Sequence, residues 1–171
     1  MQLSTRGRYA VMAMADLATR QAIGCACGPV CLAEIAGRQQ LSLAYLEQLF
    51  GKLRRAGLVG STRGPGGGYR LARPSDRISI AEIVEAVQEP THATRCEAGS
   101  GGCMAGPVMG DPGERCQTHD LWYELGLQIS FFLQGVTLAD VVSQRVRGRA
   151  VPLAGGKDGT AVPAAEPLAA N

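Results

Sequence analysis

The chain has 171 residues, which is enough for one well-buried core with a small appendage and too few for an enzyme built from two large domains. Its six cysteines are too few for a disulfide scaffold, and they gather in two groups, at positions 25, 27 and 31 and at positions 96, 103 and 116, which favours reduced thiols in the cytosol. The net charge of +2 is unevenly divided, because residues 1–75 carry ten lysines and arginines against three acids and residues 76–171 carry seven against twelve. The first part is therefore the candidate for contact with a phosphate backbone, and a solvated basic face is the alternative.

The amino-terminal stretch STRGRYAVMAMADLA places Arg6 and Arg8 before an apolar run, as a secretory signal does. Asp16 interrupts that run, and apolar side chains recur at helical spacing at Tyr9, Met12, Ala13 and Leu17. We therefore predict an amphipathic helix and not a signal. No other apolar run approaches the length that spans a bilayer, so we expect a soluble, cytoplasmic protein with no membrane partner.

Two helices joined by a tight turn are predicted next. The segment VCLAEIAGRQQ has Leu32, Ile35 and Ala36 at helical spacing. After a short break, Ser42 is the expected N-cap of a helix with an apolar stripe of Leu43, Leu46, Phe50 and Leu53. The other face carries groups that suit base edges and phosphates, as a recognition helix in a major groove requires: Ala44, Tyr45, Glu47, Gln48, Lys52 and Arg55. A helical hairpin with a purely structural role is the alternative.

The segment GSTRGPGGGYRLARP predicts two short strands joined by a glycine-rich hairpin. Val59, Ser61 and Thr62 lie on one side and Tyr69 and Leu71 on the other; the turn contains Gly64, Pro65, Gly66, Gly67 and Gly68, and the flanking cations are Arg63, Arg70 and Arg73. Glycines let a backbone approach a narrow groove closely. A nucleotide-phosphate loop does not fit, because neither glycine fingerprint of such loops is complete here. Two helices followed by a basic wing indicate DNA binding.

A fourth helix is predicted where Ser79 and Glu82 have the spacing of a capping box. They precede the apolar residues Ile80, Ile83, Val84 and Val87, which we expect to close the core of the domain.

Three cysteines and a histidine follow in a segment of mostly small and turn-forming residues, with the spacing C-x6-C-x12-C-x2-H: Cys96, Cys103, Cys116 and His119. Thiolates and imidazole suit iron-sulfur clusters, zinc or copper(I), and the spacing alone does not choose among them. A cluster of reduced structural thiols and a thiol-disulfide switch are the alternatives without a metal.

A long helix from about Thr118 to Gly135 is expected after this segment. Its apolar stripe is broad enough for its own domain and a partner helix together: Leu121, Trp122, Leu125, Ile129, Phe132, Leu133 and Val136. A two-fold dimer would then read two half-sites, and purely internal packing is the alternative. A short helix starts at Thr137 and Asp140, and the remaining residues, rich in Ala, Gly and Pro, predict a disordered tail.

The segments LSTRGRYAVMAM, LAEIAGRQQLSLAYLEQLFGKLRRAGLVGSTRGPGGGYRL, ATRC, GGC and C-x-T-H-x-L-W resemble the IscR-type winged-helix family of bacterial iron-sulfur cluster regulators over residues 1–145. The resemblance implies a homodimeric transcription factor with a [2Fe-2S] cluster on Cys96, Cys103, Cys116 and His119. It also implies DNA contacts from Ser42, Ala44, Tyr45, Glu47, Gln48 and the wing at residues 63–67, to which we add Arg6 and Arg8. It further implies repression of cluster-assembly genes, with the assembly machinery as the source of the cluster.

The expected fold is therefore mainly α with a small β-hairpin wing. We assign residues 1–90 to a winged helix-turn-helix DNA-binding domain and residues 91–119 to the cluster-binding loop. Residues 118–145 form the dimerisation helix with the short terminal helix, and residues 146–171 the disordered tail.

The cysteine spacing departs from the family, with one extra residue before Cys103 and a larger insertion before Cys116. A loop absorbs such lengthening at little cost in closure entropy, but a [4Fe-4S] cluster, or sensing of iron, nitric oxide or redox state through thiols or zinc, is the alternative. His92 is a weaker candidate ligand than His119.

Three cysteines and one alternative function lie outside this assignment. Cys25, Cys27 and Cys31 have no ligand role in the family, and we expect small half-buried thiols there, with a redox or metal site as the alternative. An enzyme or electron carrier is disfavoured, because no Ser-His-Asp arrangement, paired carboxylates or cofactor loop is present.

Overall fold

The structure, a computed structural model, describes residues 5–23, 28–88 and 117–147. In chain order the elements are α1 (Thr5–Ile23), α2 (Leu32–Gln39), α3 (Leu43–Arg55), β1 (Val59–Thr62), β2 (Gly68–Leu71), the 3-10 turn η1 (Ser75–Arg77), α4 (Ile80–Ala86), α5 (His119–Gly135) and α6 (Leu138–Val142). The expected mainly helical fold with a β-hairpin is confirmed. No helix within the described ranges is long and apolar enough to cross a membrane.

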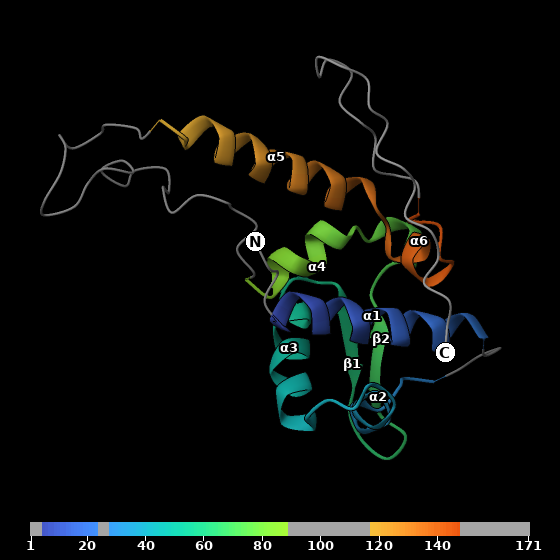
Figure 1. Cartoon of the computed structure of the whole chain (residues 1–171). Helices are drawn as coiled ribbons and strands as arrows, with labels where there is room; N and C mark the ends of the chain where they lie inside the picture. Colours follow the sequence, from blue (N-terminus) through green and yellow to red (C-terminus); the bar gives the residue numbers. More distant parts are fainter. Residues whose placement is uncertain (1–4, 24–27, 89–116, 148–171) are drawn as a thin grey trace, which may run out of the picture.

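Helix α1 runs through the middle of the domain and contacts α2, α3, α4, α6 and β2 (Figure 1). Its buried stripe consists of Ala10, Ala13, Met14, Leu17 and Ala18. Met12, which we had placed on the apolar face, is 38% exposed, because it lies two residues before Met14 and so on the other side of the helix. Leu43 is likewise 41% exposed at the start of α3, whereas Leu46, Phe50 and Leu53 are buried as predicted.

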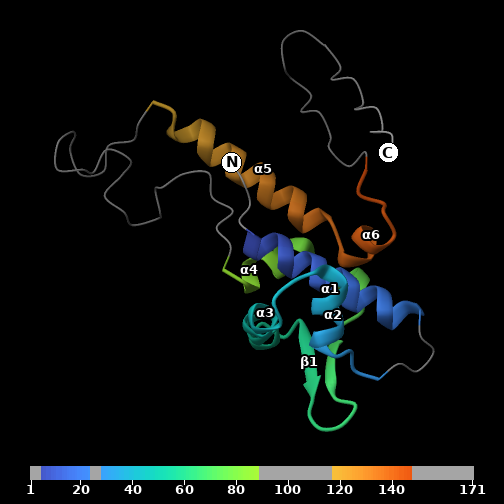
Figure 2. The same ribbon diagram turned by 60° about the horizontal axis from the view of Figure 1, so that its bottom comes forward.

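The hairpin has the predicted strands, paired antiparallel in a register that runs from Val59 opposite Leu71 to Thr62 opposite Gly68. Gly64 and Gly66 in the turn have φ values of 103° and 74°, which residues with a side chain rarely adopt. Gly68, expected in the turn, is the first residue of β2. The turn projects from the lower end of the domain in both views (Figure 2).

The starts of α4 and α6 are joined by main-chain hydrogen bonds. The Ile80 amide donates to the Val136 carbonyl at 2.9 Å, and the Leu138 amide donates to the Ile78 carbonyl at 2.8 Å. The predicted capping box of Ser79 and Glu82 is present, and a second one joins Thr137 to Asp140 at α6. Because Val136 and Leu138 are buried in the same core as α1, the chain after α5 returns to the winged helix-turn-helix domain.

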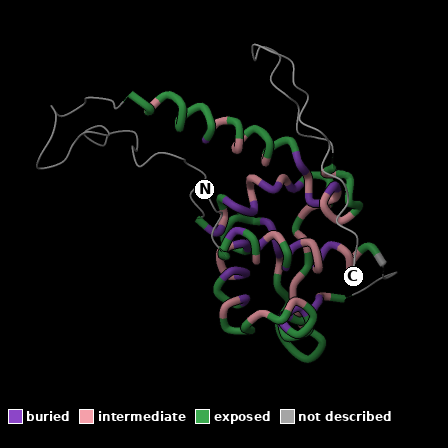
Figure 3. Tube along the Cα trace, in the orientation of Figure 1, coloured by how far each residue is buried: buried purple, intermediate pink, exposed green. Residues whose placement is uncertain are grey.

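Helix α5 lies on the side of α1 opposite the wing, and most of its surface is exposed (Figure 3). Six large apolar or aromatic side chains on it are more than a third exposed: Leu121, Trp122, Tyr123, Leu125, Phe131 and Phe132. Gly126 is the buried residue within the helix. The domain's own core therefore leaves most of the apolar surface of α5 uncovered.

An ion pair fixes α2, the first helix of the helix-turn-helix, against α1. Asp16, whose side chain is 7% exposed, accepts hydrogen bonds from Arg38 Nη2 at 2.6 Å and from Gln39 Nε2 at 2.8 Å. Burial acts to raise the pKa of the Asp16 carboxyl, but the hydrogen bonds from Arg38 and Gln39 prevail and hold its pKa below its ordinary value. The ionised carboxylate therefore stabilises the folded state.

We expect Asp16→Asn to lower the free energy of unfolding by about 1–3 kcal/mol at neutral pH, because a charge-assisted hydrogen-bond pair is replaced by a neutral one. A depressed pKa contributes stability that is complete above the unfolded value of about 3.9 and is lost as the pH falls through the folded value. Urea unfolding at a series of pH values should show the two proteins converging below about pH 4. A difference that stays constant or grows on acidification would contradict this role of Asp16.

Candidate nucleic-acid interface

The exposed face of α3 presents a mixed set of polar groups. Ala44, Glu47, Gln48 and Arg55 all lie on it and are exposed, as predicted for a recognition helix. Ser42 is the N-cap residue with extended backbone, and its hydroxyl makes no capping hydrogen bond. The predicted polar side chains of the first two turns are thus presented to solvent together.

The wing turn lies at the same end of the domain as the start of α3 (Figures 1 and 2). Arg63, Gly64, Pro65 and Gly66 are exposed, and Gly67 is half-buried. A Cβ at Gly67 would overlap the Thr62 carbonyl, so the turn requires glycine there. The start of α3 and the wing turn therefore lie at one end of the domain, an arrangement in which a helix can enter a major groove while the turn approaches the adjacent backbone.

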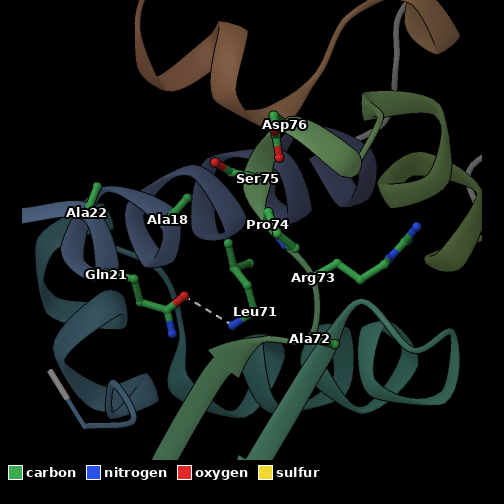
Figure 4. A pocket seen from close by; sticks show the side chains of 9 residues that line it. All are labelled: Ala18, Gln21, Ala22, Leu71, Ala72, Arg73, Pro74, Ser75 and Asp76. Atoms are coloured by element: carbon green, nitrogen blue, oxygen red, sulfur yellow. Dashed lines mark hydrogen bonds between the residues drawn. The ribbon is translucent and has the colours of Figure 1, made fainter. Parts of the chain in front are cut away.

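The wing is attached to the helix-turn-helix through its second strand. Tyr69 exchanges two main-chain hydrogen bonds of 2.8 Å with Val30, the residue two positions before α2. A Cβ at Gly68 would overlap the Val30 carbonyl, which explains glycine at the start of β2. The amide of Leu71 donates to Gln21 Oε1 at 3.2 Å, beside an open pocket of about 470 Å³ between α1 and the chain after β2 (Figure 4). These contacts hold β2 against α1 and against the residues that precede α2.

Two arginines that bear on the interface have structural partners. Arg54, which our sequence interpretation missed, reaches from α3 to Ser61 Oγ in β1 at 3.3 Å. Its position in the sequence next to Arg55, a predicted DNA contact, is the feature that could have indicated it. Arg73, expected as a wing cation, pairs with Glu82 at 2.7 Å. The hydrogen bond from Arg73, followed by the one from the Ser79 amide, lowers the pKa of Glu82.

Tyr45, Lys52 and Arg6, named as DNA-contact candidates, lie toward neighbouring helices. Tyr45 is half-buried, and its ring packs edge-on against Tyr9 of α1 with ring centroids 6.2 Å apart. Lys52 Nζ donates to Gln88 Oε1 at 3.0 Å, and Arg6 Nη1 donates to the Gln88 carbonyl at 3.3 Å. Arg8, the other candidate on α1, is exposed.

Of the four candidate metal ligands, the structure describes His119 alone. His119 is the first residue of α5, half-buried, with its ring stacked 6.2 Å from that of Tyr123. Cys96, Cys103 and Cys116 lie outside the described residues, as do Cys25, Cys27 and His92. Cys31 is an exposed free thiol preceding α2, and not the half-buried one expected. Among the residues that are described, no three His, Cys, Asp or Glu side chains form a metal-binding group.

The donor set itself has the chemistry of a cluster site. Three thiols and one imidazole are soft to borderline ligands, and His119 stands at the end of a rigid helix, directly after the segment that carries the cysteines. Helix α5, which His119 begins, lies on the side of α1 opposite the wing (Figure 1).

Known proteins share both the sequence and the fold. A model of the Rrf2 family, iron-dependent transcriptional regulators, matches residues 3–144. The HTH-type transcriptional regulator IscR of Sodalis glossinidius is 50% identical over 143 residues, which cover 84% of this chain and 79% of that protein. Among solved structures, T. potens IscR has 34% identity and a TM-score of 0.63, covering 89% of this chain and 93% of its own. CymR, the global cysteine regulator of B. subtilis, has 33% identity and a TM-score of 0.64, and the match covers 84% of this chain and 98% of the CymR chain. These relatives are regulators of transcription and not enzymes.

Proposed function

The chain belongs to the Rrf2 family of transcriptional regulators, and from this premise we propose that it represses iron-sulfur cluster biogenesis genes under the control of a cluster of its own. The observation that carries the proposal is the position of α3 and the wing turn at one end of the domain, with exposed Gln48, Arg55 and Arg63, combined with a three-cysteine, one-histidine donor set in the same chain. Winged helix-turn-helix DNA binding is what the fold and the family support; the cluster and its target genes are the proposed step.

Cys96, Cys103 and Cys116 would supply thiolates and His119 an imidazole to a [2Fe-2S] cluster. When bound, the cluster would make the protein responsive to iron supply and to oxidation, because both determine whether the cluster is present. The chain's own contribution is to connect the three cysteines directly to α5, which His119 begins. Occupancy can change operator affinity only if the two states differ in interaction free energy, through the order of this segment or through dimer geometry.

The long spacing between Cys103 and Cys116 favours a second candidate. A [4Fe-4S] cluster, zinc or reactive thiols at the same four residues would make the protein a sensor of iron, nitric oxide or redox state. Fold and DNA surface stay the same in that case, and only the bound group differs.

Helix α5 is the proposed dimer contact, because Leu121, Leu125 and Phe132 are exposed along it. Large uncovered apolar surfaces of this kind mark protein interfaces. A two-fold dimer would place two α3 helices on successive half-sites of a near-palindromic operator in double-stranded DNA. The cluster-assembly machinery would load the protein in the cytoplasm, and the loaded form would repress the genes of that machinery.

The first test is binding of protein purified without oxygen to an operator duplex selected by it from a randomised pool, measured at several salt concentrations. We expect the logarithm of the association constant to fall linearly with the logarithm of salt concentration, with a slope that corresponds to several phosphate contacts. Arg55→Met should reduce that slope by about one. Absence of duplex binding would leave an electron carrier as the better interpretation.

Glu47 is expected to set operator choice. A carboxylate facing DNA is unfavourable unless it accepts a hydrogen bond from a base such as cytosine at N4, and Glu47 is exposed on α3 beside Gln48. In the proposed mechanism the cluster-bound form binds one class of operators and the cluster-free form also binds a second class. Glu47→Ala should relax discrimination between these two classes by about tenfold in the cluster-free form, while weakening the cluster-bound form less. Gel shifts on both classes measure this, with Gln48→Ala as the control that should weaken both. Equal losses on both classes for Glu47→Ala would contradict the assignment.

A further inference from the structure

The end of α4 is held by cations from two other helices. Gln88 follows α4 in the left-handed conformation, with a φ of 60°, and its carbonyl accepts a hydrogen bond from Arg6 of α1. Lys52 of α3 donates to the Gln88 side chain at 3.0 Å and to the Val87 carbonyl at 3.4 Å. Residues other than glycine keep a left-handed conformation where their surroundings hold it. Gln40 and Gln144 adopt the same conformation after α2 and α6, so it belongs to the end of a helix; at Gln88 contacts from the amino-terminal part of α1 and from the recognition helix are added.

Lys52 and Arg55 lie close together on α3 but have different contacts. With Gln88 they line one open pocket of about 310 Å³. Lys52 is half-buried and is engaged with the end of α4, whereas Arg55 is exposed and folds back on the Gly51 carbonyl of its own helix at 3.3 Å. A lysine held by an amide oxygen and a main-chain carbonyl has fewer donors left for a phosphate.

Gln88 also lies eight residues before Cys96, the first of the three candidate cysteine ligands in that part of the chain. Gln88 contacts α1 through Arg6 and α3 through Lys52, and Lys52 donates to both Gln88 and the Val87 carbonyl, so the Lys52 side chain joins the end of α4 to the recognition helix. A change in the backbone at Gln88 therefore changes a contact of the recognition helix directly.

We propose that Lys52 is a positioning residue: through Gln88 it couples binding at the candidate cluster ligands to the orientation of α3, and it does not act as a phosphate contact. The inference rests on the proposed function, in which the cluster is either bound or absent. When Gln88 holds its left-handed conformation, Lys52 fastens the carboxyl-terminal half of α3 to α4. When Gln88 leaves it, the fastening is lost and α3 is presented differently to DNA. A coupling of this kind needs an element with two arrangements that both sites bias, and Gln88 with its two cationic partners is that element.

The test is a double-mutant cycle on operator affinity with Lys52→Met, Gln88→Ala and the pair, at several salt concentrations, in the full-length protein with and without cluster. We expect each single substitution to lower affinity about three- to tenfold and the pair to be no worse than either, because both remove the same interaction. The salt slope should stay at the wild-type value. The ratio of cluster-bound to cluster-free affinity should move toward one. Arg55→Met, by contrast, should lower affinity and reduce the slope by about one.

A second variant at Gln88 distinguishes loss of the contact with Lys52 from loss of folding. Gln88→Glu keeps an acceptor for Lys52 and should bind like the wild type, with thermal melts establishing that all variants fold. The proposal is overturned if Lys52→Met reduces the salt slope by about one, if its effect adds to that of Gln88→Ala, or if Gln88→Glu behaves like Gln88→Ala. If the protein binds no cluster, the proposed function fails, whereas the cycle in the cluster-free form still decides whether Lys52 acts through Gln88.

Discussion

Phe50→Ala is expected to lower the free energy of unfolding by about 3–5 kcal/mol, the usual range for removing a buried aromatic ring. Phe50 is fully buried in α3, and its ring packs edge-on against Tyr69 of β2 with ring centroids 5.0 Å apart. The substitution leaves a cavity at the point where recognition helix and wing meet. The surrounding backbone cannot close it easily, because Tyr69 is also bonded to Val30 on its other side.

Thermal and urea unfolding measure this effect. A domain of this size should lose about 4 °C or more in Tm for each kcal/mol, so the shift should exceed about 10 °C. Leu43→Ala is the matched control on the same helix, because Leu43 is 41% exposed and should change the free energy of unfolding by no more than about 0.5 kcal/mol. Similar Tm values for the two variants would mean that Phe50 is not part of the core that supports the interface.

His119→Ala is the second large effect, and it concerns the proposed cluster and not the fold. Removing one of four ligands should abolish or strongly destabilise the cluster, with loss of its visible absorption and of iron bound per chain. Operator affinity of the anaerobic protein should fall to that of the cluster-free form, a change of about tenfold within the usual range of coupling between two sites. The Tm of the winged helix-turn-helix domain should change little, because His119 begins a helix whose surface is largely exposed.

His92→Ala is the matched control, since it removes the other histidine of the chain. That variant should keep its iron and its affinity. His119→Cys should retain a cluster with a shifted absorption spectrum, because a thiolate replaces the imidazole. Full iron in His119→Ala together with loss in His92→Ala would move the fourth ligand to His92.

Local features of the fold were predictable where one physical rule acts within a few residues. The capping box at Ser79, the strands on either side of the glycine turn and the long helix before Val136 all depend on spacing within the chain. The buried residues Leu46 and Phe50 followed from the helical period alone.

Features that depend on distant partners were not predictable in the same way. A helical period separates an apolar face from a polar face, but Lys52 lies between the two, and only the position of α4 shows that it meets Gln88. The bridge from Val30 to Tyr69 and the return of α6 to α1 join segments far apart in the chain, with no local signal in either partner. Leu43 and Met12 were misplaced because a residue at the border of an apolar stripe is assigned by its neighbours in space.

In the candidate site, too, the features that depend on nearby residues were predictable from the sequence. Ala44, Glu47, Gln48 and Arg63 lie on the exposed surface that the sequence predicted for them. The donor set of three cysteines and a histidine was recognised from residue types and spacing, and the structure places His119 at the start of α5. The cluster itself remains our proposal.

Native mass spectrometry of the protein purified without oxygen tests the central claim most directly. We expect a dimer that carries two iron and two sulfide ions per chain, and we expect His119→Ala to lose at least half of the signal of the cluster-bound mass. Zinc or a metal-free chain in the freshly prepared anaerobic protein would contradict the iron-sulfur assignment, and a monomer would contradict the role of α5. Four iron and four sulfide ions per chain would keep the regulator and replace the [2Fe-2S] cluster by the [4Fe-4S] alternative.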